Sequence, residues 1–308
     1  MGRYIIRRTV TGALAILFLI TATFILVRLM PGSPFDTGNV SEQVLETVKS
    51  EYGLDQPMHV QYITYMKNFF HGEFGMSMKK QGVSVGSVIA SCLPITTGLG
   101  ILAFVMALMG GMLLGITQVM TGNRWVRSAV SLYQSIGMGI PNYVFGLLLL
   151  LVFGVSFRWL PVSGADGISN YILPAITLAI YPSCVISHMV CTAVEKELTK
   201  SYVRFLRAEG FSEKMILIRH IGKRVFSRIL VYLGQLLGYL LTGSFVVENL
   251  YTIPGLGREF VNSISNRDYT LILGLTVFMG TVLIVIQIML DVFQMALEPK
   301  MRVEVENV

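Results

Sequence analysis

Uncharged apolar runs alternate along the chain with more polar segments. The runs cover Thr9–Val27, Gln81–Asn123, Ser128–Phe157, Gly167–Val194, Ile229–Val247 and Tyr269–Leu290. A helix needs roughly 17 to 25 mostly apolar residues to cross a bilayer, and every run reaches that range. The pattern therefore predicts an all-α integral membrane protein with six transmembrane helices.

The first run follows Arg3, Arg7 and Arg8 and ends before Pro31. It is too long for the apolar core of a signal peptide, and no clear small-residue cleavage site follows it. We therefore expect residues 1–30 to form a retained first helix with a cytoplasmic N-terminus.

Proline and glycine mark expected features within the later runs. Pro94 is expected at the start of the second span, Gly137–Pro141 is expected to make the third flexible, and Pro174 and Pro182 are expected to bend the fourth. Glycine pairs four residues apart, Gly111 with Gly115 and Gly234 with Gly238, favour close contact between helices.

Residues 31–87 are the polar exception and predict a small extracytoplasmic insertion. Two short helices are expected there, over Ser41–Tyr52 and Pro57–Phe70, with Gly53 closing the first. The segment is too short for a large core of its own. The remaining organisation is a five-helix core over residues 88–295, with a cytoplasmic loop at 196–228 and a cytoplasmic tail at 296–308.

Composition and charge exclude several classes of protein. A chain that is 53% hydrophobic and 14% charged is too apolar for an ordinary soluble domain. The net charge of +6 does not indicate nucleic-acid binding, because the basic residues cluster beside the apolar runs. Of the 24 Lys and Arg residues, 16 fall in the segments that this topology places inside, which predicts that both termini are cytoplasmic. Cys92, Cys184 and Cys191 lie in apolar runs, so no disulfide framework is indicated.

Motifs for soluble catalysis are missing from the sequence. It contains no phosphate-binding loop, no H-E-x-x-H pair and no metal-spaced Cys/His set in a loop, so nucleotide chemistry would belong to another chain. The second to sixth runs contain no Asp, Glu, Lys or Arg, which disfavours a proton-coupled carrier. The carrier alternative stays open because His188 is ionisable and sodium sites can be built from carbonyl groups.

Polar side chains at helical spacing within the spans predict a water-filled translocation path. In the fourth run Thr177, Tyr181, Cys184, His188 and Cys191 share one predicted face. The predicted path residues are Tyr133, Gln134, Asn142, Tyr181, His188, Gln235, Tyr239 and Thr242. Hydrogen bonding between packed helices is an equally good interpretation of each stripe. A soft metal on Cys184, His188 and Cys191 is a weaker alternative, because no fourth ligand is evident.

The segment 202–228 is the one long charged stretch between two spans. Helix formers from Val203 to Glu209, a possible helix stop at Gly210 and a possible cap at Ser212 predict a short helix followed by a second one. Held between two spans, the short helix could act as a lever. The alternative is a solvated basic loop that only follows the positive-inside rule.

The loop 248–268 contains a second set of structural residues. Pro254, Gly255 and Gly257 predict a tight turn that caps the outer mouth or serves as a rigid connector.

With these motifs in place, the chain resembles the membrane subunits of type I ABC importers, in the oligopeptide/dipeptide/nickel permease group. The resemblance covers nearly the whole chain. The matching blocks are Arg7–Arg8, Val27–Pro34, Tyr52–Pro57, Gly72–Ser77, Trp159–Gly164, Tyr171–Ala175, Tyr202–Arg204, Arg207–Gly210, Val246–Glu248, Ile253–Arg258, Asn266–Tyr269, Asp291 and Glu298–Pro299. The sequence departs from the family at Ser187–Cys191, where a basic residue is usual, at Glu209, where lysine is common, and at Arg228, where proline is usual.

The resemblance implies the type I importer fold, a multi-pass location in a bacterial or archaeal inner membrane, and half of a translocation path for peptides. It implies a loop that docks in an ATPase subunit, on Tyr202, Arg204, Arg207, Ala208, Glu209, Gly210, Phe211 and Ser212. The implied partners are a second permease subunit, two cytoplasmic ATPase subunits carrying ATP and Mg, an extracytoplasmic binding protein and membrane lipid. No cofactor, metal or catalytic residue is expected on this chain. The alternatives are nickel or metal-chelate import, an ATP-independent carrier and, less favoured, a membrane-embedded enzyme.

Overall fold

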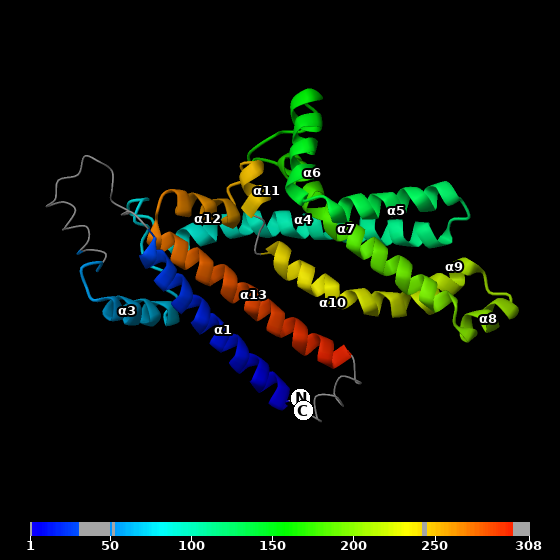
Figure 1. Cartoon of the computed structure of the whole chain (residues 1–308), viewed down its shortest axis with the longest axis horizontal. Coiled ribbons are helices and arrows are strands. Elements are labelled where there is room, and N and C mark those ends of the chain that lie inside the picture. The colour runs from blue at the N-terminus through cyan, green and yellow to red at the C-terminus, as the bar shows by residue number, and fades with distance from the viewer. Residues whose placement is uncertain (1, 31–49, 51–52, 242–244, 298–308) are drawn as a thin grey trace.

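The described residues of the computed structural model, 2–30, 50, 53–241 and 245–297, form helices and connecting turns without a named strand, which confirms the all-α prediction. Figure 1 shows two ends to the bundle, with α3 and α12 at one and α8 and α9 at the other. The elements are α1 (Gly2–Leu29), α3 (Met58–Phe70), α4 (Val85–Met120), α5 (Arg124–Gly139), α6 (Asn142–Leu149), the π-helix η1 (Leu150–Ser156), α7 (Ile168–Leu198), α8 (Ser201–Ala208), α9 (Glu213–Met215), the π-helix η2 (Ile216–Ile221), α10 (Gly222–Leu241), α11 (Phe245–Leu250), α12 (Leu256–Ser265) and α13 (Tyr269–Leu297).

In the described part of the chain, five helical segments are long and apolar enough to cross a membrane, and a sixth span exists if one bent helix pair counts as one. The bent pair is the third predicted span, Ser128–Phe157, and its break falls in the stretch Gly137–Pro141 that was expected to be flexible. It is broken into α5 and α6–η1, whose directions differ by 107°. The break follows from Pro141, because a residue before proline is displaced from the helical region and Ile140 is extended, with φ −103° and ψ 132°.

The predicted role of Pro94 is wrong. α4 begins at Val85, where the Ser84 side chain accepts a hydrogen bond from the Ser87 amide at 3.1 Å, and it continues through Pro94. A serine cap explains the earlier start. Proline is tolerated inside a membrane helix that packs against neighbours. Pro174 and Pro182 likewise lie inside α7, which continues past both of them.

The core lies where α4 and α7 pack against each other. A Cβ atom added to Gly111 would lie 2.8 Å from the Ser183 carbonyl oxygen, and one added to Gly115 would lie 2.6 Å from the Ser187 carbonyl oxygen. The two backbones can approach this closely only because these positions are glycine. The predicted packing role of this glycine pair is therefore confirmed. Gly238 has the same role on α10, where its Cβ would lie 3.1 Å from Ile286 of α13.

α1 and α13 lie side by side at the edge of the bundle (Figure 1). Arg8 of α1 forms an ion pair with Asp291 of α13 near the end of each helix at which the chain termini lie. At the opposite end, the buried carboxylate of Asp268 accepts hydrogen bonds from the Leu271 amide at 3.1 Å and the Met78 amide at 3.1 Å. Asp268 therefore caps α13 and fixes the segment before α4 to it.

The insertion has one described helix. α3 matches the expected second helix and buries none of its own residues. It is attached to α1 through Tyr62, whose ring is 5.4 Å from that of Phe24 and whose hydroxyl lies 2.7 Å from the Thr21 hydroxyl. The first expected helix, Ser41–Tyr52, falls mostly outside the described residues, although Gly53 has the positive φ of +63° that suits a helix end. The predicted tail at 296–308 also lies almost wholly outside them.

Candidate functional site

The short helix predicted in the charged loop is present as α8, between α7 and α9. It ends as expected: Gly210 has φ +85°, a conformation that costs most other residues energy, and its amide donates to the Arg207 carbonyl at 3.1 Å. The Ser212 hydroxyl then caps α9 by accepting from the Met215 amide at 3.4 Å. These turns fix where α8 ends and where α9 begins.

Only Val203 of α8 is buried. The remaining face of the helix is exposed and mixes charge with apolar surface, including Arg204, Phe205 and Ala208. Phe205 is 62% exposed, and Ile218 in the following segment is 77% exposed. Exposed apolar side chains surrounded by basic residues are typical of a surface that another protein covers.

The loop is braced internally beside this surface. Arg207 makes a two-point ion pair with Glu213, with its Nε and Nη2 atoms 2.6 and 3.1 Å from the two carboxylate oxygens. The hydrogen bond to Glu213 raises the pKa of Arg207. The Phe211 ring packs edge-on against His220 of η2, with centroids 5.8 Å apart. Arg207 and Phe211 therefore fix the shape of the loop rather than stand free.

A buried carboxylate joins α8 to the spans on both sides of it. Glu197, near the end of α7, is 1% exposed, and its oxygens accept from Lys200 Nζ at 2.6 Å and the Tyr202 hydroxyl at 2.9 Å. From α10 it accepts from Arg228 at 2.9 Å and from Arg224 at 3.4 Å. We call these residues the Glu197 cluster. Burial and the hydrogen bond to Glu197 raise the pKa of Tyr202, which keeps its hydroxyl a donor.

Four of the predicted path residues line one cavity, of about 540 Å³, at the break between α5 and α6. They come from three different stretches of chain, namely Asn142 after the break, Tyr181 on α7, and Gln235 and Tyr239 on α10. We call it the break cavity. Tyr181 is 43% exposed and Tyr239 is 51% exposed in the single chain. An open, partly polar face in the middle of a membrane bundle is expected of a surface that faces a path or a second subunit.

At the other end, the turn predicted from Pro254, Gly255 and Gly257 connects α11 to α12. Glu248 is fully buried and accepts from the Gly257 amide at 2.8 Å and the Thr96 hydroxyl at 3.1 Å. A Cβ at Gly255 would collide with the Glu248 carboxylate, so glycine is required there. The turn is a rigid connector held against α4.

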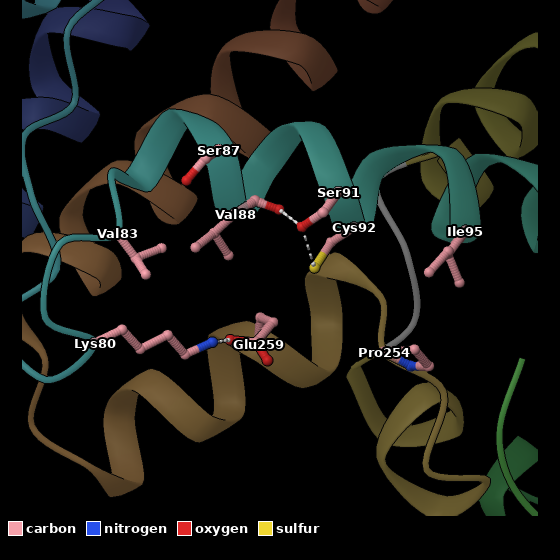
Figure 2. A pocket seen from close by; sticks show the side chains of 9 residues that line it. All are labelled: Lys80, Val83, Ser87, Val88, Ser91, Cys92, Ile95, Pro254 and Glu259. Carbon is pink, nitrogen blue, oxygen red and sulfur yellow. Dashed lines mark hydrogen bonds and ion pairs between the residues drawn. The ribbon is translucent and has the colours of Figure 1, made fainter.

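Beside that turn lies a cavity of about 350 Å³ between α4 and α12 (Figure 2). Lys80 and Glu259 form an ion pair across it, with Nζ and Oε2 2.6 Å apart. Pro254 and Cys92 also face the cavity. Because its cation and carboxylate neutralise each other, this cavity has no unpaired charge to select a ligand.

Comparison with known proteins connects this geometry to a family. Residues 87–303 match the family described as binding-protein-dependent transport system inner membrane component, and residues 1–99 match the model for the N-terminal part of such components. The dipeptide transport system permease protein DppB of Bacillus subtilis is 33% identical over 303 residues, which cover 98% of each chain. The chain is a binding-protein-dependent transport system inner membrane component. The oligopeptide transport system permease protein OppB of Salmonella typhimurium is also 33% identical, over 98% of this chain and 100% of its own.

A solved structure supports the fold of this transport component. It is an amino acid ABC transporter with histidines, matched with a TM-score of 0.55 at 19% identity over 68% of this chain and 94% of the other. With the family assignment, the likeness establishes the type I importer fold of a multi-pass membrane protein. The described helices add a broken third span to the expected pattern.

Three predicted path residues lie away from the break cavity of this transport component. Gln134 is buried, and its side-chain nitrogen donates to Gln118 of α4 and Ser187 of α7, each at 2.8 Å. The Tyr133 hydroxyl lies 2.8 Å from the Ser183 hydroxyl. For Gln134, the structure agrees with the alternative of hydrogen bonding between packed helices. His188 is exposed outside the break cavity, and Thr242 lies outside the described residues.

The polar stripe on α7 is divided between two environments. Thr177, Cys184 and Cys191 are buried, whereas Tyr181 and His188 are exposed. At about 100° per residue, the exposed pair lies on one side of the stripe and the buried cysteines on the other. No group of His, Cys, Asp or Glu able to hold a metal occurs among the described residues, so the soft-metal alternative has no support.

Sequence reasoning missed Glu197 and Glu248 as important residues. Glu248 directly follows an apolar stretch, and buried charges are almost always paired, so the position of Glu248 was a usable signal. Glu197 comes after Glu195 and Lys196, so its position does not distinguish it from the exposed Glu195. The partners of neither residue could be predicted, because Thr96 and Arg228 are 152 and 31 residues away in sequence.

Proposed function

We propose that this chain is the permease subunit of an ATP-driven peptide importer and forms half of its translocation path. The observation that carries the proposal is α8, a short helix with one buried residue and an exposed outer face, which the Glu197 cluster ties to α7 and α10. The names of the dipeptide and oligopeptide permeases, at 33% identity over almost the whole chain, favour peptides as the substrate class. Nickel or metal-chelate import is a weaker alternative, because both of these relatives are named as peptide permeases.

In this proposal the α8 end of the bundle is cytoplasmic. Arg7 and Arg8 lie on the same side, as do Arg124 and Arg127 and the nine basic residues from Lys196 to Arg228. We infer from the positive-inside rule that both chain termini are in the cytoplasm of a bacterial or archaeal cell. α3, the turn at Pro254–Gly257 and α12 would face a substrate-binding protein outside.

The proposed mechanism transmits force through a short physical route. A cytoplasmic ATPase subunit, which carries the ATP and Mg, binds α8 around Arg204, Phe205 and Ala208. When the two ATPase subunits close, α8 moves, and the Glu197 cluster transfers the displacement to Arg228 on α10. Gln235 follows seven residues later, about 10 Å along the helix axis, at the break cavity. Movement of α10 therefore moves the wall of the break cavity along which the peptide passes. The second permease forms the opposite wall.

Purification of the native complex through a tag on this chain tests the proposal. We expect a second permease, an ATPase and a binding protein to copurify, and peptide uptake by the reconstituted complex to stop with vanadate. Uptake by the purified chain alone, insensitive to vanadate, would instead identify an ATP-independent carrier. Recovery of a complex that moves nickel but not peptide would reassign the substrate while keeping the importer.

A further inference from the structure

A second cavity, of about 740 Å³, lies at the end of the bundle opposite α8. Its walls come from the last turns of α1, from α3 with its flanking residues, and from the first turns of α13. Phe24, Phe74 and Tyr269 give it aromatic surface, whereas Arg28 and Glu73 give it one residue of each charge. We call it the headgroup cavity. No role described above uses it.

Several residues that line the headgroup cavity have a buried polar atom without a hydrogen-bond partner. Of the five buried side-chain nitrogen and oxygen atoms without a hydrogen-bond partner in the described structure, three belong to residues that line it. They are Nε of Arg28, the hydroxyl oxygen of Tyr65 and the side-chain oxygen of Gln61. Buried polar groups are normally paired, so three such atoms at one cavity indicate that something else supplies the partners.

The positions of these side chains are fixed by their neighbours. The Arg28 guanidinium lies 5.3 Å from the centre of the Phe24 ring, and the Tyr65 ring lies 6.4 Å from the same ring, so both flank it. The Gln61 amide nitrogen donates to the carbonyls of Gln56 at 2.6 Å and Leu54 at 3.3 Å. Those two bonds orient the amide and leave its oxygen free to accept.

The unsatisfied atoms define the chemistry of the missing partner. Arg28 and Tyr65 each offer a donor, and a guanidinium binds phosphate or carboxylate oxygens best. Gln61 offers an acceptor, and the Glu73 carboxylate lines the same cavity, so the partner also carries a hydroxyl or ammonium donor. An anionic phosphate joined to an amine or hydroxyl meets all of these requirements.

The surroundings indicate that this phosphate belongs to a lipid. Arg28 lies in the last turn of α1, at the edge of the bundle. Beside it, Ile25, Leu26 and Leu29 are 45%, 65% and 70% exposed, as side chains that face acyl chains would be. An arginine at the end of a membrane helix reaches the headgroup level.

We propose that the headgroup cavity binds one phospholipid. Its phosphate accepts hydrogen bonds from Arg28 and Tyr65, its headgroup amine or hydroxyl donates to Gln61 with Glu73 nearby, and its acyl chains follow α1. The site lies on the membrane leaflet opposite α8. The bound lipid would fill the space between α1, α3 and α13 and attach the insertion to the membrane-spanning helices.

Native mass spectrometry of the delipidated complex, titrated with phosphatidylethanolamine, tests the site. We expect one tightly held lipid, and about tenfold weaker binding in Arg28→Gln, from the loss of a charge-assisted hydrogen bond. Tyr65→Phe removes only a hydroxyl without a protein partner and should weaken binding without unfolding α3. Lys67→Gln is the matched control, because it removes a positive charge from α3 outside the cavity and should leave the affinity unchanged.

Two further arms separate the possible ligands. Phosphatidylcholine, which lacks a headgroup donor, should bind more weakly than phosphatidylethanolamine, and equal binding would contradict the role of Gln61. Inorganic phosphate should not displace the lipid, and displacement by phosphate alone would identify a free-anion site instead. Equal lipid affinity in the wild type and Arg28→Gln would overturn the proposal.

Discussion

The role of the Glu197 cluster can be tested by replacing its carboxylate. Glu197→Gln keeps the size of the side chain but removes its charge and replaces one oxygen with an amide nitrogen. One carboxylate oxygen accepts from Lys200 and Arg228, and the other accepts from Tyr202 and Arg224. Whichever way the amide is placed, its NH2 group faces donors on one side, and the hydrogen bonds on that side are lost.

The structure sets the size of the effect. A hydrogen bond to a charged group contributes about 1.5–3 kcal/mol when buried, and an exposed ion pair about 0.2–1 kcal/mol. Glu197 is 1% exposed, but the side chains of Lys200, Arg224 and Arg228 are 39%, 54% and 41% exposed, so water covers part of the loss. We therefore expect Glu197→Gln to weaken the attachment of α8 to α7 and α10 by about 2 kcal/mol. This corresponds to a roughly 30-fold increase in how often α8 detaches.

Hydrogen exchange and transport measured on the same complex check this prediction. In Glu197→Gln, backbone amides of α8 should exchange up to roughly 30-fold faster, and peptide uptake per ATP hydrolysed should fall while the complex stays assembled. Glu195→Gln is the matched control, because Glu195 is two residues away on the same helix but exposed. In the double variant Glu197→Gln/Arg228→Gln, the loss of α8 attachment energy should be smaller than the sum of the losses in the two single variants. Unchanged α8 exchange and unchanged coupling in Glu197→Gln would refute the transmission route.

Other variants test the packing and the loop. Gly115→Ala should lower the free energy of unfolding of the purified complex by about 1–3 kcal/mol, because the new methyl group meets the α7 backbone. Gly98→Ala on the same helix has open space around it and should leave that free energy unchanged. Gly210→Ala should lower uptake moderately, because a Cβ meets nothing there but φ +85° costs about 1–2 kcal/mol, and a fully active variant would argue against a fixed α8 exit. Arg207→Glu should block uptake by facing Glu213 with a like charge, and the exchanged pair Arg207→Glu/Glu213→Arg should restore part of it; no recovery would show that Arg207 acts on the partner rather than on the loop shape.

Much of the fold was predictable because membrane-spanning helices can be recognised from short stretches of sequence. Apolar runs located α1, α7 and α13, and glycine spacing located the contact made by Gly115. The loop helix was equally local, since helix formers end at Gly210 and Ser212 can cap the next turn. These features depend on a few neighbouring residues, which a sequence shows directly.

The sequence did not show how far the third span would bend or which residues would meet between helices. Periodicity could not show that Ile140 would be extended and turn the third span by 107°, although Pro141 marked the place. Gln134 fits a path and a helix contact equally well by spacing, and only its distance from Ser187 shows the helix contact. The Glu197 cluster joins residues up to 31 positions apart, and such pairings depend on how the helices pack.

The central claim is that force from an ATPase reaches the membrane through α8. The most direct measurement is cysteine crosslinking from Ala208→Cys in the native complex, because Ala208 is exposed and the native Cys92, Cys184 and Cys191 are buried. Ser169→Cys, exposed near the start of α7, is the control for the opposite side of the membrane. We predict that Ala208→Cys crosslinks to the ATP-hydrolysing subunit and that Ser169→Cys does not. A complex that imports peptide while Ala208→Cys never crosslinks to that subunit would contradict the account.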